Sequence, residues 1–292
     1  MSDAFSRYHP LVNFMYFALV LSFSMVFMHP VCLAVSLLCA LAYSVYLNRR
    51  KAVSFSLKYM LPALILTALI NPLFNHAGVT ILGYFRSGNP LTLESIIYGA
   101  AAAVMLVTVI SWFSCFNVVI TSDKFVYLFG RAVPAMSLIL AMSLRLAPRF
   151  KAQARAISNA QRCVGRDISS GNIIRRAGSG MKIISILVTW ALEDAIDTAD
   201  SMKGRGYGLP GRTAFSIYRF DKRDAMTMLG LLVCGAYIIA GALLGGLRFR
   251  YFPMVAGATT GLFAYSLFFA YFAMCIVPVV LNIVEDRKWK RI

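Results

Sequence analysis

The chain has 292 residues, of which 59% are hydrophobic and 14% are charged. Soluble domains are usually about 45–50% apolar and about 25% charged, so this composition excludes both a soluble globule and a disordered chain. Lys and Arg number 29 against 12 Asp and Glu, a net charge of +17, which in a soluble protein suggests nucleic acid but in a membrane protein reports basic residues kept in the cytoplasm.

Six apolar stretches are long enough to cross a bilayer, which requires about 20 residues each. In chain order they are Leu11–His29, Pro30–Leu47, Lys58–Phe74, Ser95–Ile120, Ala225–Leu247 and Pro253–Val284. The sequence therefore predicts an all-α polytopic membrane protein with about six transmembrane helices. Four of them form an N-terminal membrane domain at 1–120, and the last two belong to a C-terminal segment at 225–292 that ends in a basic tail.

Between these membrane segments, residues 121–224 carry 17 Lys and Arg and 8 Asp and Glu. Two apolar runs, Ala132–Leu144 and Met181–Leu192, are too short to cross a bilayer and are typical of interfacial helices. Apolar residues at three- and four-residue spacing predict an amphipathic helix over Pro148–Gly165, and a second helix over Met181–Met202. We therefore expect a cytoplasmic domain of amphipathic helices at 121–224.

An even number of spans places both termini on one side of the membrane. If the termini and 121–224 are cytoplasmic, all basic residues except Arg86, Arg248 and Arg250 lie inside. The positive-inside rule therefore predicts that the N and C termini are both cytoplasmic.

The predicted spans offer almost no ionisable side chain, apart from His29 at one edge. An ion-driven carrier usually keeps an Asp, Glu or His within its spans, so a self-sufficient secondary carrier is disfavoured. The chain also has no GxxxxGK[ST] phosphate-binding motif, so it does not hydrolyse ATP by itself. A transporter built on this chain would need a partner to supply energy.

Aspartates recur at three-residue spacing in two places, Asp194, Asp197 and Asp200, and then Asp221 and Asp224. They could hold a metal–diphosphate in a membrane prenyltransferase, although such enzymes use a wider spacing. The alternative is an acidic helix face that pairs with nearby arginines, which we prefer.

The second predicted helix ends in a glycine-rich run, in which Gly204 and Gly206 flank Arg205. Glycines at a helix end leave an open backbone that a partner can approach closely. The guanidinium of an arginine placed there would suit a carboxylate, because its fork binds bidentately and stays charged.

Several stretches carry a resemblance to a known family over nearly the whole chain. They are His9–Val12, Asn71–Gly78 with Leu91–Glu94, Thr121–Ser122 with Leu144–Pro148, and Met202–Tyr207. Together they resemble the transmembrane T component (EcfT/CbiQ-like) of energy-coupling factor transporters, importers of the ABC superfamily. The last stretch is similar to the second Ala-Arg-Gly coupling motif, with Gly204 in place of Ala.

The first coupling motif of that family, Ala-Gln-x-Ala-Arg-Gly, corresponds to Ala160–Gly165. Val164 stands at the arginine position, and Arg162 and Arg166 are the arginines that could replace it. The resemblance implies six ATPase-coupling residues: Arg205, Gly204, Gly206, Arg162, Gly165 and Arg166. We also expect Glu193 and Asp197 to orient the coupling arginines by ion pairing.

The resemblance implies a non-catalytic scaffold in a prokaryotic plasma membrane, within an importer of a vitamin or metal ion. Its partners would be two ABC ATPase subunits, a membrane-embedded substrate-binding S component and the lipid bilayer, without nucleic acid. The chain itself would bind no cofactor, since ATP and Mg²⁺ belong to the ATPases. ATP-driven closure would reach the S component through the coupling helices.

Overall fold

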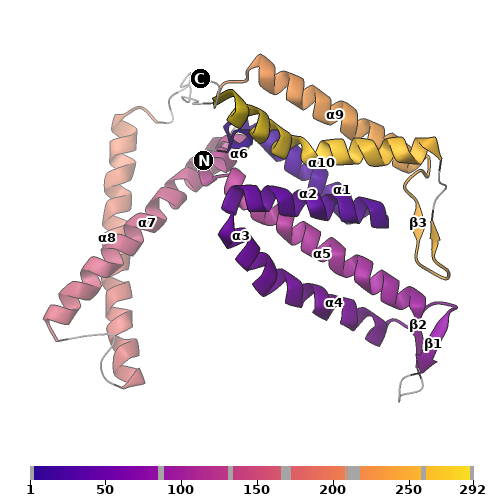
Figure 1. The fold of residues 1–292 in the computed structure, drawn as a ribbon. Helices are drawn as coiled ribbons and strands as arrows, with labels where there is room; N and C mark the ends of the chain where they lie inside the picture. Colours follow the sequence, from indigo (N-terminus) through magenta and orange to yellow (C-terminus); the bar gives the residue numbers. More distant parts are fainter. Residues whose placement is uncertain are drawn as a thin grey trace. The chain divides into compact units, whose positions relative to one another are not determined.

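The computed structural model describes residues 3–84, 89–130, 134–165, 172–207, 209, 218–257 and 261–289. Helices make up most of them and strands form only short hairpins, so the all-α prediction is confirmed. The chain divides into two compact units (Figure 1). Residues 1–121 with 218–292 are called the membrane unit, and residues 122–217 are called the charged unit.

Most helices of the membrane unit follow the predicted spans to within a few residues. They are α1 (Pro10–Val26), α2 (Pro30–Asn48), α3 (Arg50–Phe55), α4 (Leu61–Phe74), α5 (Leu93–Val119), α9 (Lys222–Leu243) and α10 (Leu262–Trp289), with a π-helical turn at Ser56–Met60 joining α3 to α4. By length and composition, five helical segments of the described chain could cross a membrane: Pro30–Asn48, Ala52–Phe74, Leu93–Val119, Lys222–Leu243 and Leu262–Arg287. α1 is a shorter apolar helix of 17 residues.

The last predicted span began too early. Instead of a helix from Pro253, the chain forms an antiparallel hairpin of β3 (Phe249–Arg250) and β4 (Ala256–Gly257), and α10 starts only at Leu262. Hydrophobicity alone does not separate an apolar hairpin from the end of a helix. A second hairpin, β1 (Ile81–Tyr84) with β2 (Pro90–Thr92), joins α4 to α5.

The core of the membrane unit is aromatic and contains paired polar groups. Tyr16 and Trp112 are fully buried and meet edge to face, with ring centroids 6.0 Å apart. The Trp112 indole donates to the Ser36 hydroxyl at 2.9 Å, and the Tyr16 hydroxyl donates to the Cys275 carbonyl at 3.0 Å. Buried polar atoms need such partners, and these hydrogen bonds tie α1, α2, α5 and α10 together.

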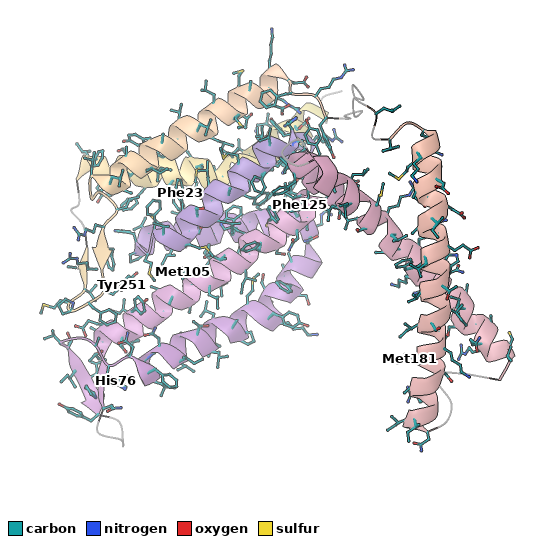
Figure 2. All side chains as sticks on the ribbon, turned by 180° about the vertical axis from the view of Figure 1, so that it is seen from behind. Phe23, His76, Met105, Phe125, Met181 and Tyr251 are labelled. Carbon is teal, nitrogen blue, oxygen red and sulfur yellow. The ribbon has the colours of Figure 1, made fainter. Side chains whose placement is uncertain are left out.

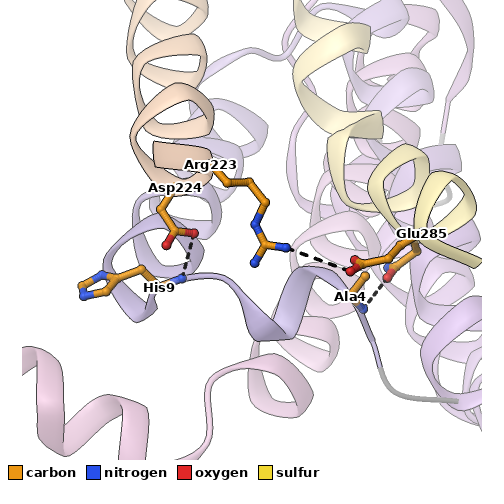
Figure 3. A network of polar contacts seen from close by, with 6 residues as sticks. Ala4, His9, Arg223, Asp224 and Glu285 are labelled. Carbon is orange, nitrogen blue, oxygen red and sulfur yellow. Dashed lines mark hydrogen bonds and ion pairs between the residues drawn. The ribbon is translucent and has the colours of Figure 1, made fainter. Parts of the chain in front are cut away.

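A polar network, here called the clasp, joins the N-terminal segment to α9 and α10 (Figure 3). Asp224 is 3% exposed, and one of its oxygens accepts the backbone N–H of His9 at 3.3 Å. Its other oxygen accepts the N–H of Asp221 at 3.2 Å, in a capping box that starts α9. Asp224 thus fixes both the start of α9 and the approach to α1.

The clasp continues from α9 to α10. The Arg223 guanidinium lies 4.2 Å from the Tyr8 ring centroid and 4.0 Å from a carboxylate oxygen of Glu285. The backbone N–H of Ala4 donates to the Asn282 side-chain oxygen at 2.6 Å. Segments from the two ends of the chain are therefore held at the same end of the helix bundle.

The described part of the charged unit consists of α6 (Ser122–Gly130), α7 (Pro134–Cys163) and α8 (Ile173–Gly204). Both long helices begin earlier than predicted, since α7 runs through Pro148 and α8 starts before Met181. The described part of the first short apolar run, Pro134–Leu144, and the second run, Met181–Leu192, are therefore parts of long helices rather than separate short ones. Pro148 removes one helical hydrogen bond, yet α7 continues on both sides of it.

Candidate functional site

The C-terminal end of α8 presents Arg205 at its cap. Gly206 follows with φ +74°, and its N–H donates to the Lys203 carbonyl at 2.9 Å. The Tyr207 N–H donates to the Met202 carbonyl at 3.1 Å. These two bonds define a Schellman cap, whose left-handed position favours glycine. Arg205 is exposed at the negative end of the helix dipole, where a cation is favoured.

The end of α7 has the same left-handed glycine and one of the same two capping bonds. Gly165 also has φ +74°, and its N–H donates to the Arg162 carbonyl at 3.0 Å. Val164 lies between the end of α7 and this glycine, as Arg205 does in α8, and it is 70% exposed. The two helices therefore end alike, with a valine where α8 has its arginine.

The structure distinguishes the arginines considered for the first motif. Counted from the left-handed glycine, Arg162 occupies the position of Lys203 rather than that of Arg205. Arg166 lies outside the described residues. An added Cβ on Gly204 would meet no heavy atom within 4 Å, so packing at this site admits the alanine of the family motif.

α7 and α8 meet at a crossing that the sequence reasoning had not identified (Figure 1). Phe150 and Trp190 pack edge to face, with centroids 5.8 Å apart. The Arg149 guanidinium lies 5.7 Å from the Trp190 ring and within 2.9 Å of both carboxylate oxygens of Asp194. Asp194 follows Trp190 by one helical turn, so the two side chains share one face of α8. This spacing in the sequence could have indicated their common contact with α7.

The structure supports the predicted role of only some of the acidic residues on α8. Asp194 confirms the prediction of an acidic face that pairs with an arginine, through Arg149. Glu193 and Asp197 lie on exposed positions of α8, and their role in orienting coupling arginines stays a prediction.

Three other aspartates of the metal–diphosphate alternative also have partners in the protein. Asp200 lies 3.9 Å from the Lys203 ammonium, and Asp221 and Asp224 form the capping box of α9. Among the residues that the structure describes, no group of three or more His, Cys, Asp or Glu could hold a metal ion.

One face of α8 carries large exposed apolar side chains at three- and four-residue spacing. We call it the apolar face; its members are Met181, Ile184, Val188, Leu192 and Ile196. Figure 2 labels Met181 on this helix. Ile183, by contrast, is only 7% exposed. An apolar stripe on a charged helix commonly marks a contact with another protein or with lipid.

Known proteins are similar in sequence to defined parts of this chain. Residues 7–215 match the CbiQ family, described as cobalt transport protein. Curated relatives named energy-coupling factor transporter transmembrane protein EcfT include that of Lactobacillus helveticus, 33% identical over 102 residues, which are 35% of this chain and 37% of the relative. The protein from Lactococcus lactis subsp. cremoris is 30% identical over 108 residues, 37% of this chain and 41% of the relative.

The protein from Streptococcus thermophilus is 34% identical over 106 residues, 35% of this chain and 40% of the relative. The chain thus aligns with about two fifths of the length of these relatives. The family match covers well over half of the chain, and the apolar helices indicate a multi-pass membrane protein. The chain therefore belongs to the CbiQ cobalt transport protein family, as an EcfT/CbiQ-like T component of energy-coupling factor transporters.

Proposed function

We propose that the chain is the transmembrane scaffold and energy-coupling subunit of an ECF-type ABC importer. In this proposal it is non-catalytic, and two ATPase subunits hydrolyse ATP. The observation that carries the proposal is the repeated helix end, since Gly165 and Gly206 share φ +74° and similar caps. Two similar helix ends suit two similar ATPase subunits.

Arg205 is the proposed ATPase contact at the end of α8. It is exposed, and the glycine cap beside it lets a partner approach the backbone. A bidentate guanidinium–carboxylate pair would provide both attraction and a defined orientation. At the end of α7, Val164 would offer an apolar contact instead, with Arg162 two positions before it.

The apolar face of α8 is the proposed docking surface for the substrate-binding S component. Movement imposed at the ends of α7 and α8 would reach this face through the Arg149, Trp190 and Asp194 crossing, which links the two helices. The crossing thus lets the helix pair move as one lever. The transported substrate, a metal ion or a vitamin, would be selected by the S component.

The proposed topology places both termini and the charged unit in the cytoplasm of a prokaryotic cell. Its support is the distribution of charge, because Arg86, Arg248 and Arg250 are then the basic residues left outside. A reporter fused in the segment between α4 and α5 should be read as external.

Co-expression with two ATPases and an S component tests the proposal. Arg205→Glu should reduce ATPase co-purification by about tenfold or more, as expected for a charge pair turned into a repulsion, and should abolish uptake without reducing membrane insertion. The matched control is Lys182→Glu, the same charge change elsewhere on α8, where Lys182 is exposed.

Normal assembly and uptake in Arg205→Glu would refute the ATPase contact. Uptake by the purified chain alone would support a self-sufficient carrier instead. Magnesium-dependent turnover of a prenyl diphosphate would support a prenyltransferase.

A further inference from the structure

A groove lies between the ends of α1 and α9 in the membrane unit. Its volume is about 640 Å³, within the range of about 300–1,000 Å³ usual for small-molecule sites. Its lining includes Phe23 and Val26 of α1, Ala242 and Leu243 of α9, and Gly245 and Arg248 of the turn that follows. Figure 2 labels Phe23 on α1. The groove is therefore apolar along two helices and basic in the turn beyond them.

The position of the groove along α9 matches the boundary of a bilayer. α9 has 22 residues, and at 1.5 Å per residue it is about 33 Å long, close to the hydrocarbon thickness of about 30 Å. Ala242 and Leu243 belong to its last turn, whereas Arg248 comes five residues after its end. The groove thus extends from the acyl-chain region to the headgroup region.

The electrostatics at the end of this groove favour an anion. The carbonyls at the end of α9 are partly neutralised, because Gly245 and Gly246 donate to the Ala242 and Gly241 carbonyls at 3.0 Å each. In the segment that follows α1, the Tyr251 hydroxyl donates to the Met28 carbonyl. The Gly245 and Gly246 bonds reduce the negative character that the C-terminus of α9 would otherwise give the site.

Arg248 then supplies the positive charge. Its side chain is exposed and lines the groove. In the proposed topology it is one of three basic residues outside the cytoplasm, against the general trend. A guanidinium binds phosphate oxygens bidentately. Arg248 at headgroup depth therefore complements the phosphate of a phospholipid, and the apolar groove beside it complements an acyl chain.

We propose that this groove binds a glycerophospholipid, with an acyl chain along Phe23, Val26 and Leu243 and the phosphate on the Arg248 guanidinium. The inference depends only on the membrane unit and not on ATPase coupling.

Native mass spectrometry of the full-length detergent-solubilised chain tests this site. The probes are phosphatidylglycerol and a diacylglycerol with the same acyl chains but no phosphate. Arg248→Gln should lower phosphatidylglycerol occupancy by about fivefold, the effect of one basic residue on an anionic lipid, and leave diacylglycerol occupancy unchanged. Ser22→Trp should reduce both, since Ser22 lines the groove and is exposed.

Arg250→Gln is the matched control, because Arg250 is exposed on β3 and is not among the residues that line the groove. It should bind both lipids as the unaltered chain does. Ala242→Phe is a second groove-filling variant, for use if Ser22→Trp does not fold. Unchanged phosphatidylglycerol occupancy in Arg248→Gln, or in a folded groove-filling variant, would overturn the proposal. Displacement of the lipid by inorganic phosphate would also overturn it, by showing an anion site without an acyl-chain contribution.

Discussion

The membrane unit and the charged unit are both helical, but they bury their side chains differently. The membrane unit has a continuous core in which Tyr16, Trp112 and Leu267 are fully buried. In the described part of the charged unit, Ile157 and Ile183 are the buried hydrophobic side chains. Close packing of such side chains stabilises a helix bundle in a bilayer, where the surrounding lipid is as apolar as the core. We infer that the membrane unit is stabilised by its own core to a greater extent than the charged unit is.

Glycine substitutions test this difference between the two units with the largest expected effect on stability. An added Cβ at Gly241 would collide with the buried Leu267 side chain, whereas one at Gly204 would meet nothing. Gly241→Ala should destabilise the membrane unit by about 1–3 kcal/mol, the usual cost of overpacking. Gly204→Ala should be neutral or stabilise α8 by up to about 1 kcal/mol. Thermal unfolding of the purified variants measures both, and equal effects would contradict the comparison.

Carboxylate substitutions should give an effect of similar size. Asp224 is buried and accepts the N–H groups of His9 and Asp221, whereas Asp197 is exposed on α8. Asp224→Ala should cost about 1–3 kcal/mol because buried donors lose their acceptor. Asp197→Ala should change the unfolding free energy by less than about 0.5 kcal/mol. A larger loss for Asp197→Ala, measured by denaturant unfolding, would show that the charged unit depends on its acidic face.

The smallest expected effect is a pH dependence confined to the membrane unit, which contains all three histidines of the chain. The His9 ring nitrogen accepts the Leu11 N–H, and the His29 ring nitrogen accepts the Val31 N–H. Burial lowers the pKa of both rings, although Asp224 partly opposes this for His9. Because the folded state favours the neutral rings, their contribution is present above the ordinary histidine pKa and is lost as the pH falls through the lowered pKa.

Thermal stability compared at neutral and mildly acidic pH checks this expectation. The loss on acidification should be below about 1 kcal/mol per helix cap, and His9→Asn with His29→Asn should reduce it, since Asn keeps a cap acceptor that does not titrate. An unchanged pH dependence in the double variant would assign it to other groups.

The spans could be predicted because their lengths and composition leave few alternatives. Pro30 begins α2 and Phe74 ends α4 in both the prediction and the structure. The start of α10 could not be predicted in this way, because the hairpin before it is also apolar. In that hairpin Gly257 lies opposite Phe249, and this pairing depends on tertiary contacts rather than on local sequence.

At the candidate site, the glycines at the ends of α7 and α8 were visible in the sequence, since a left-handed cap favours that residue. The choice of Asp194 over its neighbours was less visible. Glu193, Asp194 and Asp197 are close in sequence, and the crossing angle of two helices decides which of them reaches Arg149. The Arg149 contact depends on tertiary structure, which one sequence does not reveal.

The bond between Ala4 and Asn282 has a consequence for biosynthesis. These residues are separated by 278 positions, so the N-terminal segment emerges from the ribosome long before its partner in α10. Domains generally fold as units during synthesis, but this membrane unit is interrupted by the whole charged unit. Its first helices therefore enter the membrane with the clasp open, and the clasp closes only after translation has reached the last helix.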